Sequence, residues 1–488
     1  MKNLITVSLV LALSTWGYGQ QTRIYVHLDT AIKQPLSGRL FVFTQKDTTK
    51  GISGQIDITN PQPAYELDVR NWTSEKPVVL DNDAHFYGVP MNEMAPGFYK
   101  VGGVIDLDHA ERGLNNPGNY YSPKDVIFKV SASGNNETHL YFTKQFKPRV
   151  FQENDSVKEV KLKSPVLSAF RKQDMFMKAA VVLPQGYRES PAKKYPVVFI
   201  IPGWGGTHYD ALGSGPRKRY GMGMGKEKIY VYLNPETQSP FGLHAFVDSR
   251  VNGPWGAALV EELIPYLEIN YPVDTDPSQH FVMGQSTGGY GALWLQLNYP
   301  KDFGGCWAVS PDPVDFSNFT GVDLYHDRNF YQDASGREFP FFLDNGVAAS
   351  TLKKEVALET FMGDGEQQQA FEAEFGLPGN NGRPQEFFDR KTGVINDAVI
   401  RTWRPYDLAL YLQQNWGRIG SDLAGKVHVY AGAEDNFFLD RAVASFGNKA
   451  RAMHADVVAE VVPSSNHFTI WSPAFTRRVQ SEIDARIK

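Results

Sequence analysis

The stretch that decides the fold is HFVMGQSTGGYGAL, residues 280–293. An apolar run ends at Met283, and apolar residues at helical spacing resume by Gly289. Between them stands G-x-S-x-G, with Ser286 at its centre, and this pattern predicts a strand, a sharp turn and a helix. Gly284 and Gly288 lack a Cβ that would collide across such a turn. The sequence therefore predicts a nucleophilic serine at Ser286; the alternative is a tight turn in which Ser286 only caps the helix.

The same alternation of apolar strands and helices continues on both sides of this stretch. Continuous apolar runs of this kind are typical of a parallel sheet that is covered by helices on both faces. Between about 315 and 400 the alternation stops, which predicts an insertion after the sixth core strand. The strands that we expect span residues 195–201, 228–233, 280–283, 306–309, 426–430 and 457–462. The helices that we expect around the serine span residues 257–269 and 289–297.

The first third of the chain has a different pattern. From residue 21 to about 147 it consists of short alternating runs separated by Gly, Pro and Asn clusters. Such spacing predicts an all-β, sandwich-like domain. The polar stretch 151–164 predicts a linker. We therefore expect an accessory β-domain at 20–155 and an α/β domain at 165–488.

Residues 1–19 have the layout of a secretory signal peptide. Lys2 provides the positive charge, 4–13 form a short apolar run, and Gly17-Tyr18-Gly19 ends with small residues suited to cleavage. No cysteine follows that could carry a lipid anchor, and no later stretch reaches the roughly 18 apolar residues of a membrane helix. We expect an exported protein without an integral membrane segment, periplasmic or secreted, as is typical of a bacterial envelope.

Composition excludes several classes of function. The 488 residues carry a net charge of −5, and no basic run suggests a nucleic-acid partner. One cysteine excludes a disulfide scaffold, an iron–sulfur centre and a cysteine zinc site. We expect no metal and no organic cofactor.

A nucleophilic serine needs a base and an acid that orients the base. In the predicted fold these follow the serine in the order acid, then histidine. Asp435 follows the strand that ends near 432, and His467 follows the next strand. Glu434 and Asp440 are the alternatives for the acid. His428 and His454 are disfavoured as the base because they fall inside a strand and a helical stretch.

The developing oxyanion also needs donors. The amide that follows the nucleophile belongs to Thr287, and a second donor is expected from the glycine-rich loop after the third core strand, Pro202-Gly203-Trp204-Gly205-Gly206. We assign it to Trp204, with Gly205 as the neighbouring alternative.

Residues 170–488 resemble the esterase-D-like and feruloyl-esterase-like family of α/β-hydrolases. The resemblance rests on 195–206, on 262–266, on the Ser286 motif and on the Asp435 and His467 loops. The resemblance implies that the protein hydrolyses carboxylic esters. The expected substrate is a small-molecule ester or an ester linked to a polysaccharide. This chain departs from the family at two places: the family more often has histidine where this chain has Gln285, and it usually has His-Gly where this chain has Pro202-Gly203.

We assign five residues to substrate binding. The resemblance places a stretch like 244–255 near the active site of some members. The aromatic insertion predicts either a lid or a small satellite core. The five residues are Gln285, Asp248, Trp255, Asp312 and Trp403.

The sequence thus predicts an exported serine esterase that acts through Ser286, His467 and Asp435 and an acyl-enzyme. Two alternatives remain. A serine peptidase on the same fold would use the same three residues. A surface-binding protein with an inert hydrolase fold, which binds glycan through its sandwich-like domain, would not need them.

Overall fold

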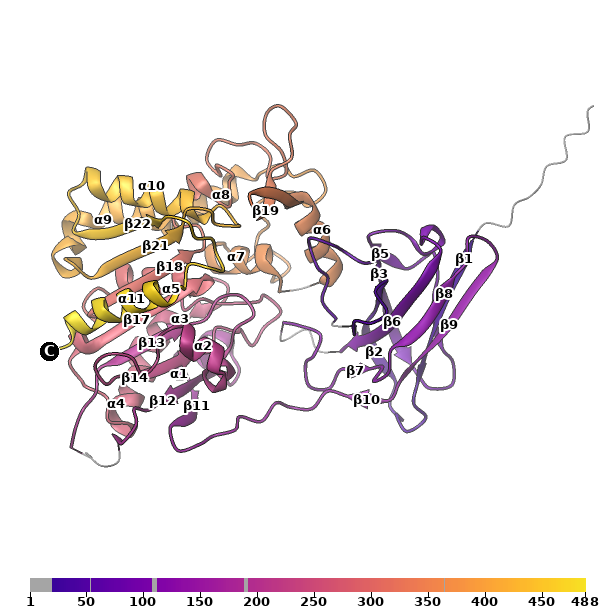
Figure 1. Ribbon diagram of the computed structural model, residues 1–488, viewed down its shortest axis with the longest axis horizontal. Coiled ribbons are helices and arrows are strands. Elements are labelled where there is room, and N and C mark those ends of the chain that lie inside the picture. Colours follow the sequence, from indigo (N-terminus) through magenta and orange to yellow (C-terminus); the bar gives the residue numbers. More distant parts are fainter. Residues whose placement is uncertain (1–19, 53, 108–111, 188–191, 364) are drawn as a thin grey trace, which may run out of the picture. The chain divides into compact units, whose positions relative to one another are not determined.

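The computed structural model describes residues 20–52, 54–107, 112–187, 192–363 and 365–488 (Figure 1). The chain divides into two compact units. Unit 1 comprises Met1–Leu107 and Pro117–Lys147, and unit 2 comprises Asp108–Asn116 and Pro148–Lys488. The predicted signal peptide, residues 1–19, lies outside the described residues.

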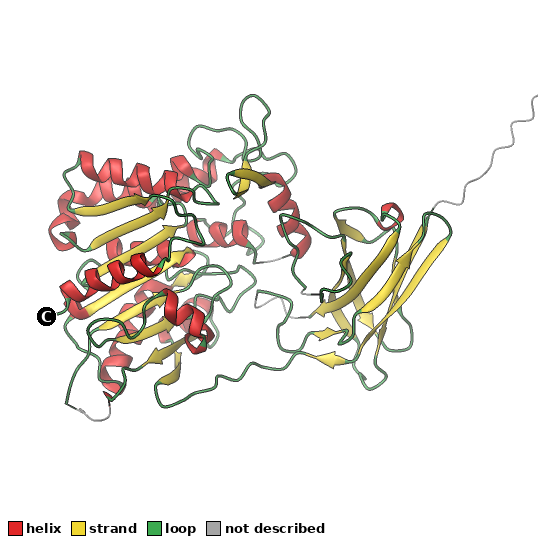
Figure 2. Cartoon of the chain, in the orientation of Figure 1, coloured by secondary structure: helices red, strands yellow, loops and turns green. Residues whose placement is uncertain are grey.

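The strands of unit 1 form two sheets (Figure 2). Side chains alternate along β1, where Ile24, Val26 and Leu28 are buried. These residues share one apolar core with Leu40 and Val101 of the other sheet, so the two sheets pack face to face. The three-stranded sheet contains β1 (Gln21–Leu28), β4 (Val78–Leu80) and β9 (Asn135–Phe142). The larger sheet contains β2 (Leu36–Gln45), β3 (Ala64–Trp72), β5 (His85–Tyr87), β6 (Gly97–Asp106), β7 (Tyr120–Tyr121), β8 (Val126–Val130) and β10 (Lys144–Gln145).

Unit 2 is built on an eight-stranded sheet in the order β11-β12-β14-β13-β17-β18-β21-β22. β12 runs antiparallel to both of its neighbours, and the strands from β14 to β22 are parallel. The bounds are β11 (Val157–Lys163), β12 (Phe176–Val182), β13 (Val197–Ile201), β14 (Ile229–Leu233), β17 (His280–Ser286), β18 (Gly305–Pro311), β21 (Val427–Gly432) and β22 (Val457–Val462). Two short hairpins, β15 (Asp248–Ser249) with β16 (Gly253–Pro254) and β19 (Pro340–Asp344) with β20 (Val347–Thr351), lie outside this sheet.

Helices cover both faces of this sheet (Figure 2). Val198 and Ile200 pack with Val479 of the C-terminal helix, whereas Val197 and Phe199, which point to the other face, are equally buried. Burial on both faces explains the continuous apolar runs of the strands and confirms the predicted α/β-hydrolase fold after a β-sandwich-like domain. The helices are α1 (Pro165–Arg171), α2 (Ser214–Arg219), α3 (Trp255–Ala258), α4 (Ile264–Asn270), α5 (Thr287–Asn298), α6 (Leu352–Met362), α7 (Gln367–Phe375), α8 (Asp397–Trp403), α9 (Leu408–Leu423), α10 (Leu439–Ala452) and α11 (Pro473–Arg486).

The stretch predicted to be a linker contains the first strand of the sheet. β11 pairs only with β12, at the edge of the sheet. Only Val157 and Val160 are buried in it, and the remaining residues are polar or partly exposed. An edge strand needs few apolar residues, which explains why its sequence does not look like that of the central strands.

The predicted insertion contains β19, β20, α6 and α7 and ends near α8, between β18 and β21. Among the described residues, no helix is long and apolar enough to cross a membrane.

Candidate active site

Ser286 lies in a strained turn between β17 and α5. Its φ is 59° and its ψ is −128°, a conformation that costs energy in any residue other than glycine. A Cβ on Gly288 would lie 1.9 Å from the carbonyl oxygen of Ile201, and one on Gly284 would lie 2.3 Å from the carbonyl oxygen of Gly288. The two glycines therefore let the turn pack against β13, and the turn presents the serine at the carboxyl end of the sheet.

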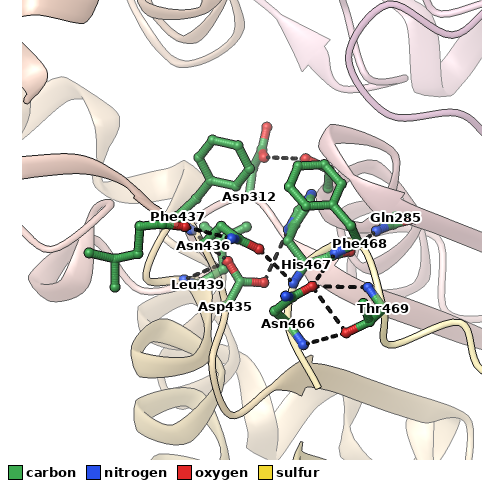
Figure 3. A network of polar contacts seen from close by, with 12 residues as sticks. Gln285, Asp312, Asp435, Asn436, Phe437, Leu439, Asn466, His467, Phe468 and Thr469 are labelled. Atoms are coloured by element: carbon green, nitrogen blue, oxygen red, sulfur yellow. Dashed lines mark hydrogen bonds and ion pairs between the residues drawn. The ribbon is translucent and has the colours of Figure 1, made fainter. Parts of the chain in front are cut away.

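The predicted acid and base lie side by side at this end of the sheet. Asp435 follows β21, His467 follows β22, and Asp435 Oδ2 is 3.0 Å from His467 Nδ1 (Figure 3). Both side chains are buried, and Asp435 Oδ1 accepts the amide N–H of Phe437 at 2.9 Å. Of the acids considered, Asp435 is thus the one that contacts the histidine, whereas Glu434 is exposed.

The Ser286 hydroxyl contacts a second carboxylate. It donates a hydrogen bond to Asp312 Oδ1 at 3.2 Å, and the Thr287 hydroxyl donates to Asp312 Oδ2 at 2.7 Å. Asp312 follows β18, and its own amide donates to the Ser286 carbonyl at 3.1 Å. Among the hydrogen bonds of the described residues, none joins Ser286 to His467. Asp312, which we assigned to substrate binding, therefore lies against the nucleophile itself.

Burial raises the pKa of Asp312 to about 6. The hydrogen bond from Thr287 and the nearby His467 act in the opposite direction and lower the pKa, but burial outweighs them. The carboxyl is therefore mostly ionised at neutral pH and protonated below about pH 6.

The histidine loop is held by two amide side chains. Gln285 Nε2 donates to the His467 carbonyl at 2.6 Å, and Gln285 Oε1 accepts the Trp471 indole N–H at 2.9 Å. Asn436 Oδ1 accepts the His467 amide at 3.2 Å. Both polar atoms of the Gln285 side chain thus have partners within the chain, and they position the loop that carries His467. The sequence had indicated a role in substrate binding instead.

The glycine-rich loop after β13 lies beside the nucleophile. A Cβ on Gly203 would be 3.3 Å from the Ser286 Cβ. Thr287 is the first residue of α5, and the first amides of a helix have no carbonyl partner within the helix. The glycine-rich loop and the start of α5 thus both lie next to Ser286, and the assignment of Trp204 and Thr287 as oxyanion donors stays a prediction.

Sequence reasoning missed Arg112, which packs on this loop. Its guanidinium lies 4.5 Å from the Trp204 ring centroid and pairs with Glu236 at 3.3 Å. Its Nε is buried and has no hydrogen-bond partner in the described structure. Nothing local in the sequence around Arg112 indicates this contact, because the arginine follows β6 and is nearly a hundred residues from Trp204.

Asp248, Trp255 and Trp403, the other residues assigned to substrate binding, make hydrogen bonds or ring contacts with neighbouring residues of the chain. Asp248 accepts hydrogen bonds from the Tyr299 hydroxyl and from the Ala257 amide. Trp255 stacks on the buried His244 with 3.6 Å between ring centroids. Trp403 is completely buried among aromatic rings of the insertion: Phe316, Phe319, Phe375 and Phe387. These contacts give the insertion a satellite core of its own.

No group of three or more His, Cys, Asp or Glu side chains in the described part of the chain is arranged to hold a metal ion.

The sequence model of one family, described as "Putative esterase", matches residues 172–480. Among solved structures, a ferulic acid esterase is 18% identical, with 70% of this chain and 100% of that chain covered and a TM-score of 0.43. An S-formylglutathione hydrolase from Agrobacterium tumefaciens is 16% identical over 68% and 95% of the two chains, with a TM-score of 0.39. A fluorophosphonate-binding serine hydrolase of Staphylococcus aureus is 14% identical over 67% and 98%, with a TM-score of 0.43.

Proposed function

The chain belongs to the Esterase family, and we propose that it is a serine hydrolase that cleaves carboxylic esters through Ser286, His467 and Asp435. The observation that carries the proposal is the contact of His467 with Asp435 at the same sheet edge as the strained Ser286 turn. A serine, a histidine and an acid arranged in this way form the minimal machinery for acyl transfer to water.

Asp435 prepares the base. The Asp435 carboxylate, 3.0 Å from Nδ1, accepts a hydrogen bond from the N–H of that nitrogen, so that Nε2 carries no proton and is able to accept one. The amide of Phe437 holds the other carboxylate oxygen. The ring of His467 is therefore fixed in the tautomer that a general base needs.

Acylation begins when the hydrogen bond of the Ser286 hydroxyl passes from Asp312 to His467. His467 Nε2 takes the proton, Oγ forms a bond to the ester carbonyl carbon, and the amides of Thr287 and Trp204 bind the oxyanion. Nε2 then gives the proton to the alcohol oxygen as the carbon–oxygen bond breaks. Water repeats the sequence on the acyl-serine and releases the acid.

We also propose that the protein is exported. The support is the signal-peptide layout of residues 1–19. Expression with the native leader should give a protein whose N-terminal residue is Gln20, measured by mass spectrometry of the intact chain. A retained Met1 would contradict export by this route.

The test of activity is labelling by a fluorophosphonate, followed by turnover of acetyl, butyryl, feruloyl and peptide substrates. The wild type should be labelled and should hydrolyse esters, and Ser286→Ala should lose both. Ser481→Ala, on the exposed surface of α11, is the matched control and should keep both. Preferential peptide cleavage would favour a serine peptidase, and a folded wild type that is not labelled would favour a non-catalytic binding protein.

A further inference from the structure

Two phenylalanine rings contact the imidazole of His467, and a third ring, from the insertion, contacts both of them. Phe437 follows Asp435, Phe468 follows His467, and Phe342 lies in β19. The ring of Phe437 is 4.9 Å and that of Phe468 is 5.3 Å from the imidazole, measured between centroids. Phe342 lies 5.3 Å from Phe437 and 6.3 Å from Phe468. We call Phe342, Phe437 and Phe468 the aromatic rim.

The rim is held in place from both sides. The amide of Leu343 donates to the Asn436 carbonyl at 2.9 Å, and Asn436 Nδ2 donates to the Leu343 carbonyl at 2.6 Å. The same Asn436 accepts the amide of His467. The β19–β20 hairpin is thus hydrogen-bonded directly to the loop of the acid and, through Asn436, is linked to the loop of the base.

The rim is open to solvent although it is apolar. Phe468 is 62% exposed, and Phe342 and Phe437 are partly exposed. Single exposed phenylalanines are common on protein surfaces, but three contacting rings, two of which lie against one buried histidine, form a continuous apolar surface. Figure 3 shows Phe437 and Phe468 beside His467.

The position beside His467 specifies which part of an ester would meet the rim. In the proposed mechanism Nε2 delivers its proton to the leaving oxygen, so that oxygen must come within about 3 Å of Nε2. The expected oxyanion donors belong to α5 and to the loop after β13, whereas His467 follows β22, on the other side of β17 in the sheet order. The group attached to the leaving oxygen therefore extends toward His467 and the phenylalanine rings that contact it.

We propose that the aromatic rim binds the alcohol part of the substrate and selects an apolar, aryl-bearing or alkyl alcohol. This inference rests on the proposed function. Phenylalanine offers apolar and aromatic contact but no hydrogen bond. A sugar hydroxyl would gain no polar partner from these three side chains, so the rim favours an alcohol without such groups.

The experiment compares acetyl esters, which share one acyl-enzyme and differ only in the alcohol. The wild type should hydrolyse 2-phenylethyl acetate with a higher kcat/KM than ethyl acetate or an acetylated methyl glucoside. Phe468→Ala and Phe342→Ala should each lower the ratio of kcat/KM for 2-phenylethyl acetate to kcat/KM for ethyl acetate about tenfold. This is the effect of one lost apolar contact in a binding pocket. Phe468→Leu, which keeps an apolar side chain, should restore part of the ratio.

The matched control is Phe98→Ala in unit 1, because Phe98 is 57% exposed and belongs to the other unit. It should leave the ratio unchanged. A second series, ethyl acetate against ethyl hexanoate, varies only the acyl group, and the rim variants should not change its ratio. An unchanged alcohol ratio, or a change that follows the acyl series instead, would overturn the assignment while leaving the proposed esterase intact. A wild type that hydrolyses none of these esters and resists the fluorophosphonate would refute the proposed function itself.

Discussion

Replacing Asp312 by asparagine should make unit 2 more stable at neutral and alkaline pH. Burial raises the pKa of Asp312 from the ordinary 3.8 to about 6, so the folded protein holds this proton more tightly than the unfolded chain. As the pH rises from 3.8 through about 6, the carboxyl must ionise in a buried position, and the free energy of unfolding falls. Above about pH 7 this cost is complete, whereas below 3.8 it is absent.

The size of the effect follows from the pKa difference of about 2, at 1.36 kcal/mol for each pKa unit. The ionised carboxylate thus costs up to about 3 kcal/mol at pH 8. Asparagine has nearly the same shape and carries no charge, so Asp312→Asn removes this cost. For a unit of about 350 residues, with an unfolding entropy of about 2.1 cal/mol/K per residue, the gain corresponds to a rise in Tm of about 4 °C.

The assay is thermal unfolding of wild type and Asp312→Asn between pH 4.5 and 8, followed by tryptophan fluorescence. Seven of the eight tryptophans in the described residues belong to unit 2, so the signal reports mainly on that unit. The variant's advantage should be small at pH 4.5 and largest at pH 8. Asp389→Asn is the control, because the pKa of Asp389 is shifted in the opposite direction: hydrogen bonds from Thr392 lower it. Removing the charge of Asp389 should therefore not stabilise the fold. A variant that is no more stable than wild type at pH 8, or whose advantage is the same at every pH, would refute the reasoning.

Three further predictions concern the strained turn at Ser286 and the loops that carry Asp435 and His467. Asp435→Asn should lower kcat on the order of 10³–10⁴-fold with little effect on KM, measured with an acetyl ester, because the base takes the wrong tautomer; a loss below tenfold would contradict its role. Gly288→Ala should destabilise unit 2 by more than about 4 kcal/mol, since its Cβ would lie 1.9 Å from the Ile201 carbonyl oxygen. Gly215→Ala, which meets nothing within 4 Å, should behave like wild type in the same unfolding experiment. Asn436→Ala should lower kcat about tenfold by freeing the loop of the base, and it should leave fluorophosphonate labelling detectable; an unchanged kcat would show that the loop holds itself.

Local sequence was sufficient for the elements that depend on local physics. The β17–turn–α5 prediction was right because glycines and a serine between an apolar run and a helical run have few other ways to fold. β11 was missed because an edge strand needs only two buried residues. Phe437 and Phe468 could have been singled out as neighbours of Asp435 and His467, but Phe342, about a hundred residues earlier, could not.

By itself, the sequence determined the central strands and the helices around Ser286, the class of fold, and which serine, acid and histidine lie at one sheet edge. These follow from hydrophobic period, glycine positions and the rule that parallel strands present their carboxyl ends together. Only the tertiary structure decided that Asp312 holds the serine hydroxyl, that Gln285 holds the histidine loop, and that Trp255 and Trp403 are packed in cores. The reason is physical: hydrogen bonds and burial depend on distances between segments that are remote in the chain, and residue type alone does not specify those distances.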